Sequence, residues 1–343
     1  MAGSPLVVEH PQPNAAWLAR LREDILEPDL PIIDPHHHLW DRSGNRYYLD
    51  ELLADVTAGH NVVATVFLQC YWAYRTSGPE EMRPVGETEF VASVAAEALR
   101  RQARVRACAA IVGHADLRLG ERVDAVLQAH IEAAKGRFRG IRHVTARHPD
   151  LLASIAEPPP VGLMADAGFR AGYARLANLG LSFDAWLYHT QLDELFDLVG
   201  EYPNIPVVIN HVGGPLGVGP FRNKQNEVFA AWRGSMRRLA EYPHVSVKLG
   251  GLAMAINGFD FHKEALPPSS GELAQAWRPW MNECIEAFGA SRCMFESNFP
   301  VDKAMCSYPV LWNAFKRIAY AASADEKSAL FHDTAAQFYR ISA

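Results

Sequence analysis

A short apolar segment near the beginning of the chain runs into side chains that could hold a metal or move protons. Residues 31–41 read PIIDPHHHLWD. An extended strand places alternate side chains on one face, so His36 and His38 would point one way and His37 the other. Two imidazoles that converge at a strand end can bind a divalent cation or exchange protons with a substrate. The spacing therefore predicts a site at His36 and His38, with a solvated polar loop as the alternative.

Four further histidines follow other strand-like segments. Each one alone is explained at least as well by a hydrogen-bonded histidine at the edge of the fold. Together with His36 and His38 they would form a ring of imidazoles at one end of a parallel sheet, which is typical of a proton-transfer or metal site. The four residues are His114, His143, His189 and His211.

Two arginines flank Gly140 in a segment that reads RFRGIRH. Arg139 and Arg142 have opposite parity along a strand, so at most one can point inward unless the strand breaks at Gly140. An inward arginine would bind a substrate carboxylate through two parallel hydrogen bonds. An ion pair with a neighbouring helix is an equally good alternative.

Other polar and aromatic side chains are also candidates for substrate binding. Gln69 could donate a hydrogen bond to substrate, or fill the end of the fold as a polar plug. Lys248 is an unusual charge for a strand and must be paired or functional. Tyr71 and Trp72, on the loop after Gln69, could line a ring-shaped substrate, although aromatic residues also cover the rims of barrels.

Eight apolar, β-rich segments alternate with amphipathic helical segments. The alternation predicts a parallel sheet, and eight such units close most simply into a (β/α)8 TIM-like barrel, with a doubly wound open sheet as the alternative. No glycine-rich dinucleotide fingerprint follows the first strand, which disfavours the open sheet. We expect strands at residues 32–38, 62–69, 105–112, 138–144, 181–188, 207–210, 245–249 and 293–297.

The predicted organisation is an N-terminal helical extension over residues 1–30, with a helix at 14–25, and a barrel hydrolase domain over residues 31–343. The long connections after strands two, six and seven would all emerge at the carboxyl ends of the strands, where barrels build active sites. Helices are expected at residues 49–59, 89–102, 121–134, 164–178, 191–202, 226–242, 271–288, 310–321 and 324–339.

The composition is that of an ordinary globular protein. Of the 343 residues 49% are hydrophobic and 21% charged, with a net charge of −6, so we expect no nucleic-acid partner. No apolar run reaches the roughly 18 residues of a membrane span, and residues 1–11 lack the features of a signal peptide, so we expect no membrane association and a cytoplasmic location. The five cysteines form no CxxC pair, which fits packing in a reduced interior.

The eighth strand-like segment, residues 292–303, reads RCMFESNFPVDK. Here the chain resembles the amidohydrolase superfamily, in the branch of barrel lactonases. The resemblance extends over nearly the whole chain through the Asp-x-His-x-His segment and the motifs GRFRGIRH, NHVGG and KLGG. It implies hydrolysis of a cyclic ester, since similar proteins open sugar lactones, muconolactones and pyrone dicarboxylates. It also implies that His36 and His38 are the first-strand pair, that His189 and His211 follow strands five and six, and that Arg139 or Arg142 holds a carboxylate.

One departure from the family pattern concerns the water-activating group. Similar proteins usually carry Gly-Ser-Asp-x-Pro at the end of strand eight, whereas this chain has Glu296, Ser297 and Asn298 before its proline. An amide cannot act as a base. We therefore hypothesise that Glu296 serves as base or ligand and that Asn298 orients substrate, with Asp302 as a weaker substitute. The alternative is that Glu296 is a buried partner of Lys248.

Two mechanisms remain open for the water. A divalent ion, most simply zinc, could be held by His36, His38 and Glu296, with His189 as a further candidate ligand. Alternatively, a carboxylate takes the proton while imidazoles polarise the carbonyl, with no metal.

The predicted function is the hydrolysis of a lactone or similar cyclic ester of a small substrate that carries a carboxylate. Its predicted catalytic residues are Glu296, His189, His211, His36 and His38. Two alternatives are a non-oxidative decarboxylase or hydratase of an unsaturated or aromatic acid, and a barrel that binds a metabolite without turnover. Association into a homo-oligomer is left open by three aromatic residues that we expect to be exposed, Phe331, Phe338 and Tyr339.

Overall fold

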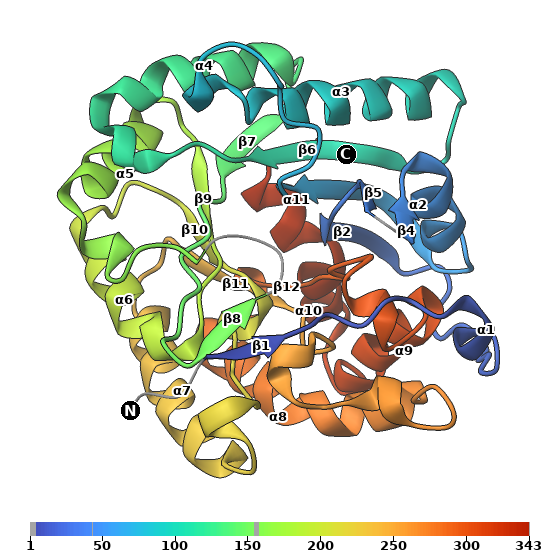
Figure 1. Ribbon diagram of the computed structural model, residues 1–343. Coiled ribbons are helices and arrows are strands. Elements are labelled where there is room, and N and C mark those ends of the chain that lie inside the picture. Colours follow the sequence, from blue (N-terminus) through green and yellow to red (C-terminus); the bar gives the residue numbers. More distant parts are fainter. Residues whose placement is uncertain (1–4, 43, 154–157, 343) are drawn as a thin grey trace.

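The computed structural model describes residues 5–42, 44–153 and 158–342. Its centre is a sheet of eight parallel strands whose order in space follows their order in the chain (Figure 1). They are β2 (Pro31–His37), β5 (Asn61–Leu68), β6 (Arg106–Gly113), β7 (Phe138–Ile141), β9 (Ser182–Ala185), β10 (Val207–Ile209), β11 (Val245–Leu249) and β12 (Cys293–Phe295).

The chain after the last strand returns to the first strand and closes the sheet into a barrel. The backbone N–H of Asn298 donates to the carbonyl oxygen of His36 at 2.9 Å, and that of His38 donates to the carbonyl oxygen of Phe299 at 2.8 Å. A parallel bridge joins His37 to Phe299. The predicted (β/α)8 barrel is thus confirmed, and the open doubly wound sheet is excluded.

Helices surround the barrel (Figure 1). The longest of them, α8, begins with a capping box in which Ser269 and Glu272 satisfy each other's backbone N–H groups. The helices are α1 (Ala15–Leu18), α2 (Leu49–Val56), α3 (Val85–Arg100), α4 (Val123–Ala133), α5 (Ala167–Asn178), α6 (Leu192–Glu201), α7 (Gln225–Ala240), α8 (Ser270–Phe288), α9 (Tyr308–Ile318), α10 (Ala324–Ser328) and α11 (Thr334–Phe338).

The strands carry one hydrophobic core on their outer side and another inside the barrel. Along β5, Phe67 packs into the outer cluster against the helices, whereas Val66 and Leu68 belong to the inner cluster. All three side chains are fully buried. Burial on both faces explains why this strand is almost continuously apolar instead of alternating.

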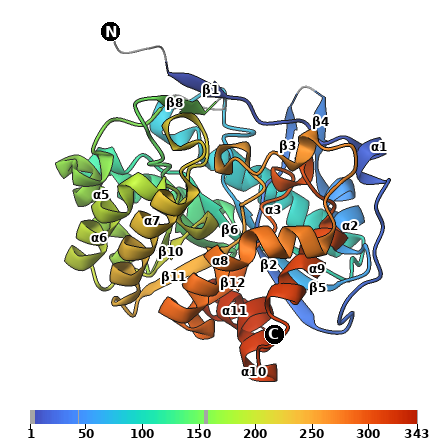
Figure 2. The same cartoon turned by 90° about the horizontal axis from the view of Figure 1, so that it is seen from below.

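The C-terminal helices close the end of the barrel at which the strands begin. Ala335, Tyr339 and Ile341 belong to the inner cluster. Near the start of β7, Arg139 donates from Nε to the carbonyl oxygen of Tyr339 at 2.6 Å. Figure 2 shows α10 and α11 on the side of the barrel away from β1 and β8. The last residues of the chain therefore form the floor of the barrel.

This floor corrects the prediction of exposed aromatic residues near the C-terminus. Phe331 and Tyr339 are buried, and Phe338 is half-buried against the inner cluster. A π-helical turn over Ala329–Asp333 joins α10 to α11. The aromatic side chains thus pack into the fold, and they give no support to an interface between copies of the chain.

The N-terminal extension is less helical than predicted. The helix expected at residues 14–25 is reduced to the single turn of α1. Beyond this turn, Glu23 accepts hydrogen bonds from the backbone N–H and hydroxyl of Ser270 and from the side-chain amide of Asn313. These contacts to α8 and α9 hold the chain in an irregular path, so tertiary contacts override the local helical pattern.

The first residues of the extension cross the other end of the barrel. The strand β1 (Leu6–Val8) pairs in parallel with β8 (Leu151–Ala153), which belongs to the long loop after β7. Both lie in front of the barrel in Figure 1 and above it in Figure 2. The imidazole Nε2 of His10 lies 3.3 Å from the carbonyl oxygen of Val301. We call residues 5–12 the N-terminal strap.

Three smaller features concern the cysteines, a hairpin and the helices. All five cysteines are free and buried, which confirms that they pack in the interior. A hairpin of β3 (Trp40–Arg42) and β4 (Asn45–Tyr47) follows the first barrel strand. In the part of the chain that the structure describes, none of the helices combines the length and the apolar character needed to cross a bilayer.

Candidate active site

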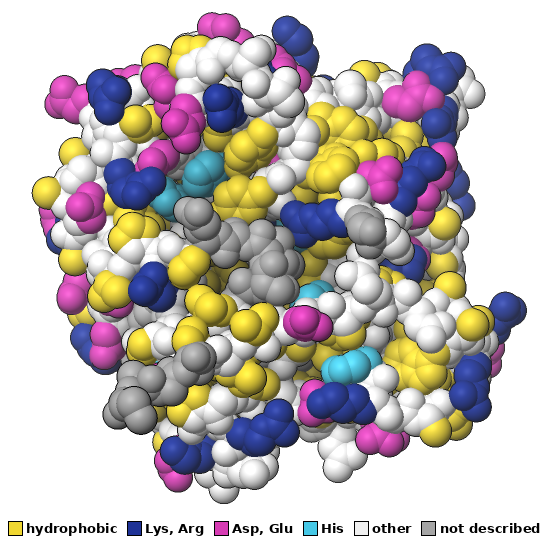
Figure 3. All heavy atoms as spheres, viewed as in Figure 1, with side chains coloured by type: hydrophobic (Ala, Val, Ile, Leu, Met, Phe, Trp, Pro, Cys, Tyr) yellow, Lys and Arg dark blue, Asp and Glu magenta, His cyan; other side chains and the backbone are white. Residues whose placement is uncertain are grey.

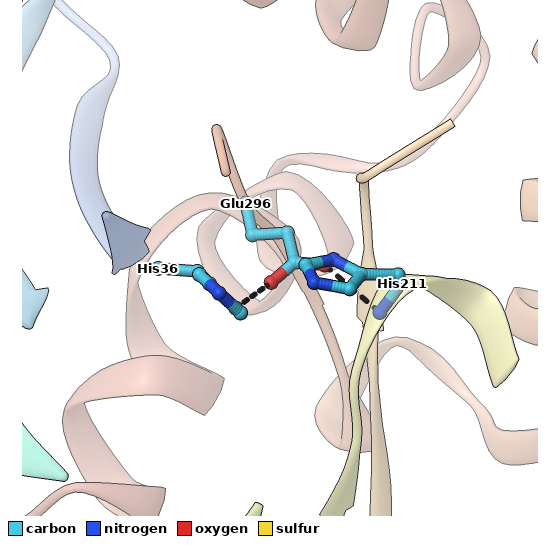
Figure 4. Close-up of side chains that lie close together, drawn as sticks. All are labelled: His36, His211 and Glu296. Carbon is cyan, nitrogen blue, oxygen red and sulfur yellow. Dashed lines mark hydrogen bonds and ion pairs between the residues drawn. The ribbon is translucent and has the colours of Figure 1, made fainter. Parts of the chain in front are cut away.

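Glu296 lies between two histidines at the carboxyl ends of the barrel strands (Figure 4). Its Oε2 atom is 2.6 Å from Nδ1 of His36, and its Oε1 atom is 2.7 Å from Nδ1 of His211. His36 lies in β2, Glu296 directly follows β12, and His211 comes shortly after β10. All three side chains are buried. The contact with His211 is a hydrogen bond, and a carboxylate placed in this way orients the His211 ring and stabilises a positive charge on it.

The backbone holds His211 against this carboxylate. The main-chain N–H of His211 also donates to Glu296 Oε1, at 3.0 Å, and the residue has a left-handed φ of 54°. A Cβ atom on Gly251 would lie only 2.3 Å from His211 Nδ1, and Gly251 itself has a φ of +68°. Only glycine tolerates both conditions. The two glycines of the KLGG motif thus include one that makes room for His211.

Both imidazoles beside Glu296 are neutral near pH 7. Burial lowers the pKa of His36 well below its usual range, and the positive charge of Lys248 lowers it further. Burial also lowers the pKa of His211, although Glu296 opposes that shift. A neutral imidazole that donates from Nδ1 keeps a lone pair on Nε2. For His211 this Nε2 atom has no hydrogen-bond partner among the described residues.

Arg142 brings a positive charge next to this group. Its Nη1 atom is 3.2 Å from Nε2 of His36, and its Nη2 atom donates to the carbonyl oxygen of Gln69. The side-chain amide of Gln69 donates in return to the carbonyl oxygen of Arg142 at 3.2 Å. Within the described chain, Nε of Arg142 has no hydrogen-bond partner. The guanidinium is therefore held in place while part of its hydrogen-bonding capacity remains unused.

His38 is a second neutral imidazole at the mouth. Its Nδ1 atom lies 2.8 Å from the carbonyl oxygen of Leu68, and its ring stacks on Trp40. Burial and the charge of Arg142 lower the pKa of His38 well below its usual range. The donor atoms that gather near Glu296 come from His36 and His211 and not from His38. The predicted ligand set of His36, His38 and Glu296 stays a prediction, because a histidine whose Nδ1 contacts a backbone carbonyl can still bind a metal through Nε2.

Asn298 is oriented by Asp302. Its Nδ2 atom donates to Asp302 Oδ1 at 2.8 Å, and the backbone of Asn298 has a left-handed φ of 54°. The amide carbonyl oxygen of Asn298 is thus left to face a ligand. Burial raises the pKa of Asp302 well above its usual range. Asp302 therefore positions Asn298, and its role as a substitute carboxylate stays a prediction.

Lys248 is paired with Asp184 inside the barrel. Its Nζ atom lies 2.8 Å from Asp184 Oδ1, and it also donates to the carbonyl oxygen of Pro35 at 2.9 Å. The hydroxyl of Tyr339 donates to the same Asp184 oxygen. The alternative explanation of Glu296 as the partner of Lys248 is therefore wrong. Lys248 itself is fully buried, its Nζ atom lies 3.4 Å from His36 Nδ1, and it does not border the cavity.

Glu87 supports the loop that follows β5. Its Oε1 atom accepts hydrogen bonds from the backbone N–H groups of Cys70 and Trp72, at 3.0 and 2.8 Å. The side chain is buried, and this burial raises the pKa of Glu87 to about 7. Gln69 and Tyr71 lie on the segment that these bonds fix, so Glu87 shapes the mouth without touching it.

A cavity of about 180 Å³ opens beside these residues. The side chains at its border that can donate or accept hydrogen bonds include the predicted candidates His38, Gln69, Tyr71, Arg142, His211 and Asn298, and also His10, Arg42, Arg147, Trp186 and Tyr188. His36 and Glu296 are completely buried behind this border. A ligand in the cavity would therefore contact His211 and Arg142 directly, and Glu296 would influence it only through His211.

Arg139 and His189 lie elsewhere than predicted. Arg139 contacts the C-terminal residues at the floor of the barrel, at the opposite end of β7 from Arg142. The pairing of β7 with β6 is irregular near Gly140, so parity did not decide between the two arginines. His189 packs against Phe221, and its Nδ1 atom accepts from a backbone N–H. Neither residue borders the cavity.

The remaining candidates serve the walls of the mouth. His114 and His143 pack against each other with ring centroids 5.0 Å apart, and His143 accepts from the backbone N–H of Leu117. Trp72 donates from its indole nitrogen to the hydroxyl of Tyr48 at 3.2 Å and does not border the cavity. The predicted ring of six imidazoles is thus reduced to His36, His38 and His211.

Asp184 and Trp186 are among the residues that the sequence analysis missed, as are Arg42 and Arg147 at the cavity border. Asp184 lies within β9. A charged residue inside a strand was the sequence signal that identified Lys248, and the same signal would have identified Asp184. Trp186 packs edge-on against His211, with ring centroids 4.7 Å apart, and borders the cavity. No sequence signal distinguishes Trp186 from other aromatic residues at strand ends.

The group around Glu296 also suits a divalent metal. One donor atom each from His36, His211 and Glu296 can be chosen so that all lie within 4.8 Å of one another. Two imidazole nitrogens and a carboxylate are ligands that zinc prefers. Within the described residues this is the one grouping of three or more potential metal-ligating side chains.

Comparison with known proteins places these observations in context. The profile of the amidohydrolase family matches residues 33–341. The chain is 34% identical over 335 residues to an uncharacterised protein, y4mH, of Sinorhizobium fredii, a match that covers 91% of this chain and 99% of that protein. It is 27% identical over 321 residues to L-fucono-1,5-lactonase of Burkholderia multivorans, which covers 90% of this chain and 96% of the lactonase.

A solved structure shows the same architecture. The fold is similar to that of an amidohydrolase from Burkholderia multivorans whose crystal structure has bound zinc. The TM-score is 0.69, the identity is 26%, and the match covers 91% of this chain and 99% of the other. The matches thus cover 90–91% of this chain.

Proposed function

This chain belongs to the amidohydrolase family, and from that premise we propose that it hydrolyses a lactone or similar cyclic ester of a small carboxylate-bearing substrate. Family membership and the lactonase relatives make it an enzyme with hydrolase or lactonase-like chemistry, in place of a barrel that only binds a metabolite. The observation that carries the proposal is the pair of Glu296 and His211, whose free ring nitrogen meets the cavity beside Arg142.

In the proposed reaction His211 is the general base. Its Nε2 atom takes a proton from a water molecule while the water oxygen bonds to the carbonyl carbon of the lactone. The ring becomes an imidazolium, which Glu296 stabilises through Nδ1. As the ring C–O bond breaks, the imidazolium returns the proton to the leaving alkoxide. The product is an open hydroxy acid, and His211 is neutral again.

Arg142 stabilises the negative charge of the intermediate. Its guanidinium is buried, held by His36 and the backbone of Gln69, and needs no reorganisation to meet a developing oxyanion. Asn298 offers its amide oxygen to a hydroxyl group or to the attacking water. His38 adds a further neutral imidazole at the border of the cavity.

A carboxylate on the substrate agrees with the charges at the border. Arg42, Arg142 and Arg147 border the cavity, and no aspartate or glutamate does so in the part of the chain that is described. With Arg142 assigned to the oxyanion, Arg42 and Arg147 remain to bind a carboxylate.

A divalent cation would be held by His36, His211 and Glu296. When bound there, such an ion would supply Lewis-acid chemistry and lower the pKa of a coordinated water molecule. The roles of Arg142, Asn298 and His38 are the same with and without it.

The test is a panel of lactones followed with a pH indicator, since ring opening releases a proton. We expect hydrolysis of at least one carboxylate-bearing lactone and its loss in His211→Asn. Glu283→Gln serves as the control, because Glu283 is also a buried, ion-paired glutamate but lies on α8. Evolution of carbon dioxide from an aromatic or unsaturated acid, with no lactone opened, would replace this proposal by the decarboxylase.

A further inference from the structure

A separate apolar cluster occupies the mouth of the barrel. Its buried members come from the strap-bound β8 and from the loops after β9, β10 and β11, and they do not belong to either core of the barrel. Figure 3, which views this end, shows hydrophobic side chains around the middle of the face and most charged side chains towards its edge. The buried members are Leu151, Tyr188, Leu216, Val218, Met254 and Ile256.

Part of this cluster forms one border of the cavity. We define the apolar wall as the six aliphatic residues that both belong to the cluster or pack against it and border the cavity. None of their side chains carries an N–H or O–H group, and the thioether sulfur of Met254 is only a weak acceptor. The six residues are Val8, Ala146, Leu151, Met254, Ile256 and Val301.

The cavity is therefore divided in chemical character. His211, Arg142 and Asn298 supply hydrogen bonds and charge at its border, and so do Arg147 and Tyr188 beside the wall. The apolar wall itself supplies only hydrophobic contact. A hydroxyl group placed against the wall would lose its hydrogen bonds to water without gaining others, which is costly. A methyl or methylene group placed there would be stabilised by leaving water.

We propose that the lactone carries an apolar substituent, alkyl or aryl, that packs against the apolar wall while its reactive carbonyl lies at His211 and Arg142. This inference rests on the proposed lactonase function and names its substrate class. It disfavours substrates that carry hydroxyl groups on the part facing the wall, because a hydroxyl group there finds no hydrogen-bond partner.

The N-terminal strap takes part in this specificity. Val8 in β1 is a member of the wall. Because β1 pairs with β8, Val8 lies near the wall residue Leu151, although the two are far apart in the sequence. His10, further along the strap, is fixed to Val301. The wall thus combines residues of the N-terminal strap with residues of the loops at the barrel mouth.

The inference is tested first by binding, which does not depend on turnover. Calorimetry would compare acetate, butyrate and hexanoate with gluconate, which carries a carboxylate on a hydroxylated chain. We expect affinity to rise by about fourfold for each added methylene, the factor that corresponds to about 0.8 kcal/mol, and gluconate to bind more weakly than hexanoate.

The second arm is kinetic and uses lactones of one ring size. Among δ-lactones that all carry one carboxylate, we expect kcat/KM to increase with the length of an alkyl substituent and to be lowest when that substituent is polyhydroxylated. Val8→Thr and Ile256→Thr should flatten both series, because each puts a hydroxyl group on the wall. Val218→Thr is the matched control, since Val218 is in the same cluster but does not border the cavity.

Each result has a defined meaning. Equal affinity for hexanoate and gluconate, or equal flattening by the Val218 control, would overturn the apolar substituent, and the lactonase proposal would still stand if lactones are opened. Chain-length-dependent binding of the acids with no lactone opened would instead remove the lactonase proposal and keep the apolar wall as a binding surface. If Val8→Thr fails to fold, Ile256→Thr decides.

Discussion

Lys248 and Asp184 form an ion pair whose atoms Nζ and Oδ1 are 2.8 Å apart and whose side chains are completely buried. The side chains of Tyr339 and Asn210 donate to the same carboxylate oxygen. Because Asp184 neutralises Lys248, the charge of Glu296 is left to His36 and His211. Removing one partner of such a buried pair is strongly destabilising. Asp184 therefore has a structural role as the partner of Lys248, and Glu296 contacts the two histidines.

Replacing Glu296 tests whether it supports His211 during turnover. Glu296→Gln should lower kcat/KM about 10²- to 10⁴-fold, because the amide cannot stabilise the imidazolium. Since Glu296 raises the pKa of His211, its loss should also move the acid limb of the pH profile to lower pH. A pH profile of kcat/KM checks both. An unchanged acid limb with normal folding would show that Glu296 does not act through His211.

The two arginines around Gly140 should behave differently on substitution. Arg142→Gln removes a charge at the cavity and should lower kcat/KM about 10²-fold or more. Arg139→Gln removes hydrogen bonds to the C-terminal carbonyl groups, so it should lower the free energy of unfolding and leave kcat/KM within about twofold. Urea unfolding and steady-state kinetics on both variants would check this. Equal kinetic losses would contradict the assignment of Arg142.

Zinc uptake distinguishes the two ligand sets. We expect the metal-free chain to take up zinc at His36, His211 and Glu296, because their donor atoms lie together. Uptake should be lost in His211→Asn and Glu296→Gln and retained in His38→Asn. Equilibrium dialysis followed by elemental analysis gives the stoichiometry without any assay of activity. If zinc uptake were instead lost in His38→Asn and retained in His211→Asn, His36 and His38 would be the histidine ligands.

Glu87 should make stability depend on pH. Burial raises its pKa from 4.5 to about 7, so the folded chain binds this proton more tightly than the unfolded chain. The resulting stabilisation is complete below pH 4.5 and is lost as the pH rises through about 7. Glu87→Gln stays neutral, so its stability relative to wild type should increase by about 3 kcal/mol over that range. Urea unfolding at pH 4.5 and pH 8 measures the difference, which would be constant if Glu87 titrated normally.

The hydroxyl of Tyr339 should matter for stability. Tyr339→Phe removes a hydrogen bond to the buried Asp184, which should cost about 1–3 kcal/mol of the free energy of unfolding. Tyr320→Phe is the matched control, since Tyr320 is 81% exposed and should tolerate the change. Denaturant unfolding of both variants checks this. Equal effects would show that the floor of the barrel does not depend on this hydroxyl.

The barrel could be predicted because its signals are local. The apolar segments of the eight strands are buried on both faces, and the helical periods between them are set by packing against the outer core. The helix expected at residues 14–25 failed for the opposite reason. Glu23 is drawn to Ser270, far along the chain, and no local pattern contains that contact.

The site was partly predictable for similar reasons. The departure at Glu296 was visible because a carboxylate stands where the family has glycine, and its distance to His36 and His211 agrees with a chemical role. His189 was misplaced because β9 ends at Ala185, and the turn that follows carries the imidazole to Phe221. The residue at which a strand ends decides where the next side chains point, and strand ends are the feature that a sequence predicts least well.

The N-terminal strap is a short ribbon of three residue pairs laid over a finished barrel. Mutation can therefore remodel it, lengthen it or replace it without disturbing the strands that carry the reacting groups. Related proteins could in this way acquire new substrate specificities while the residues of the active site stay the same.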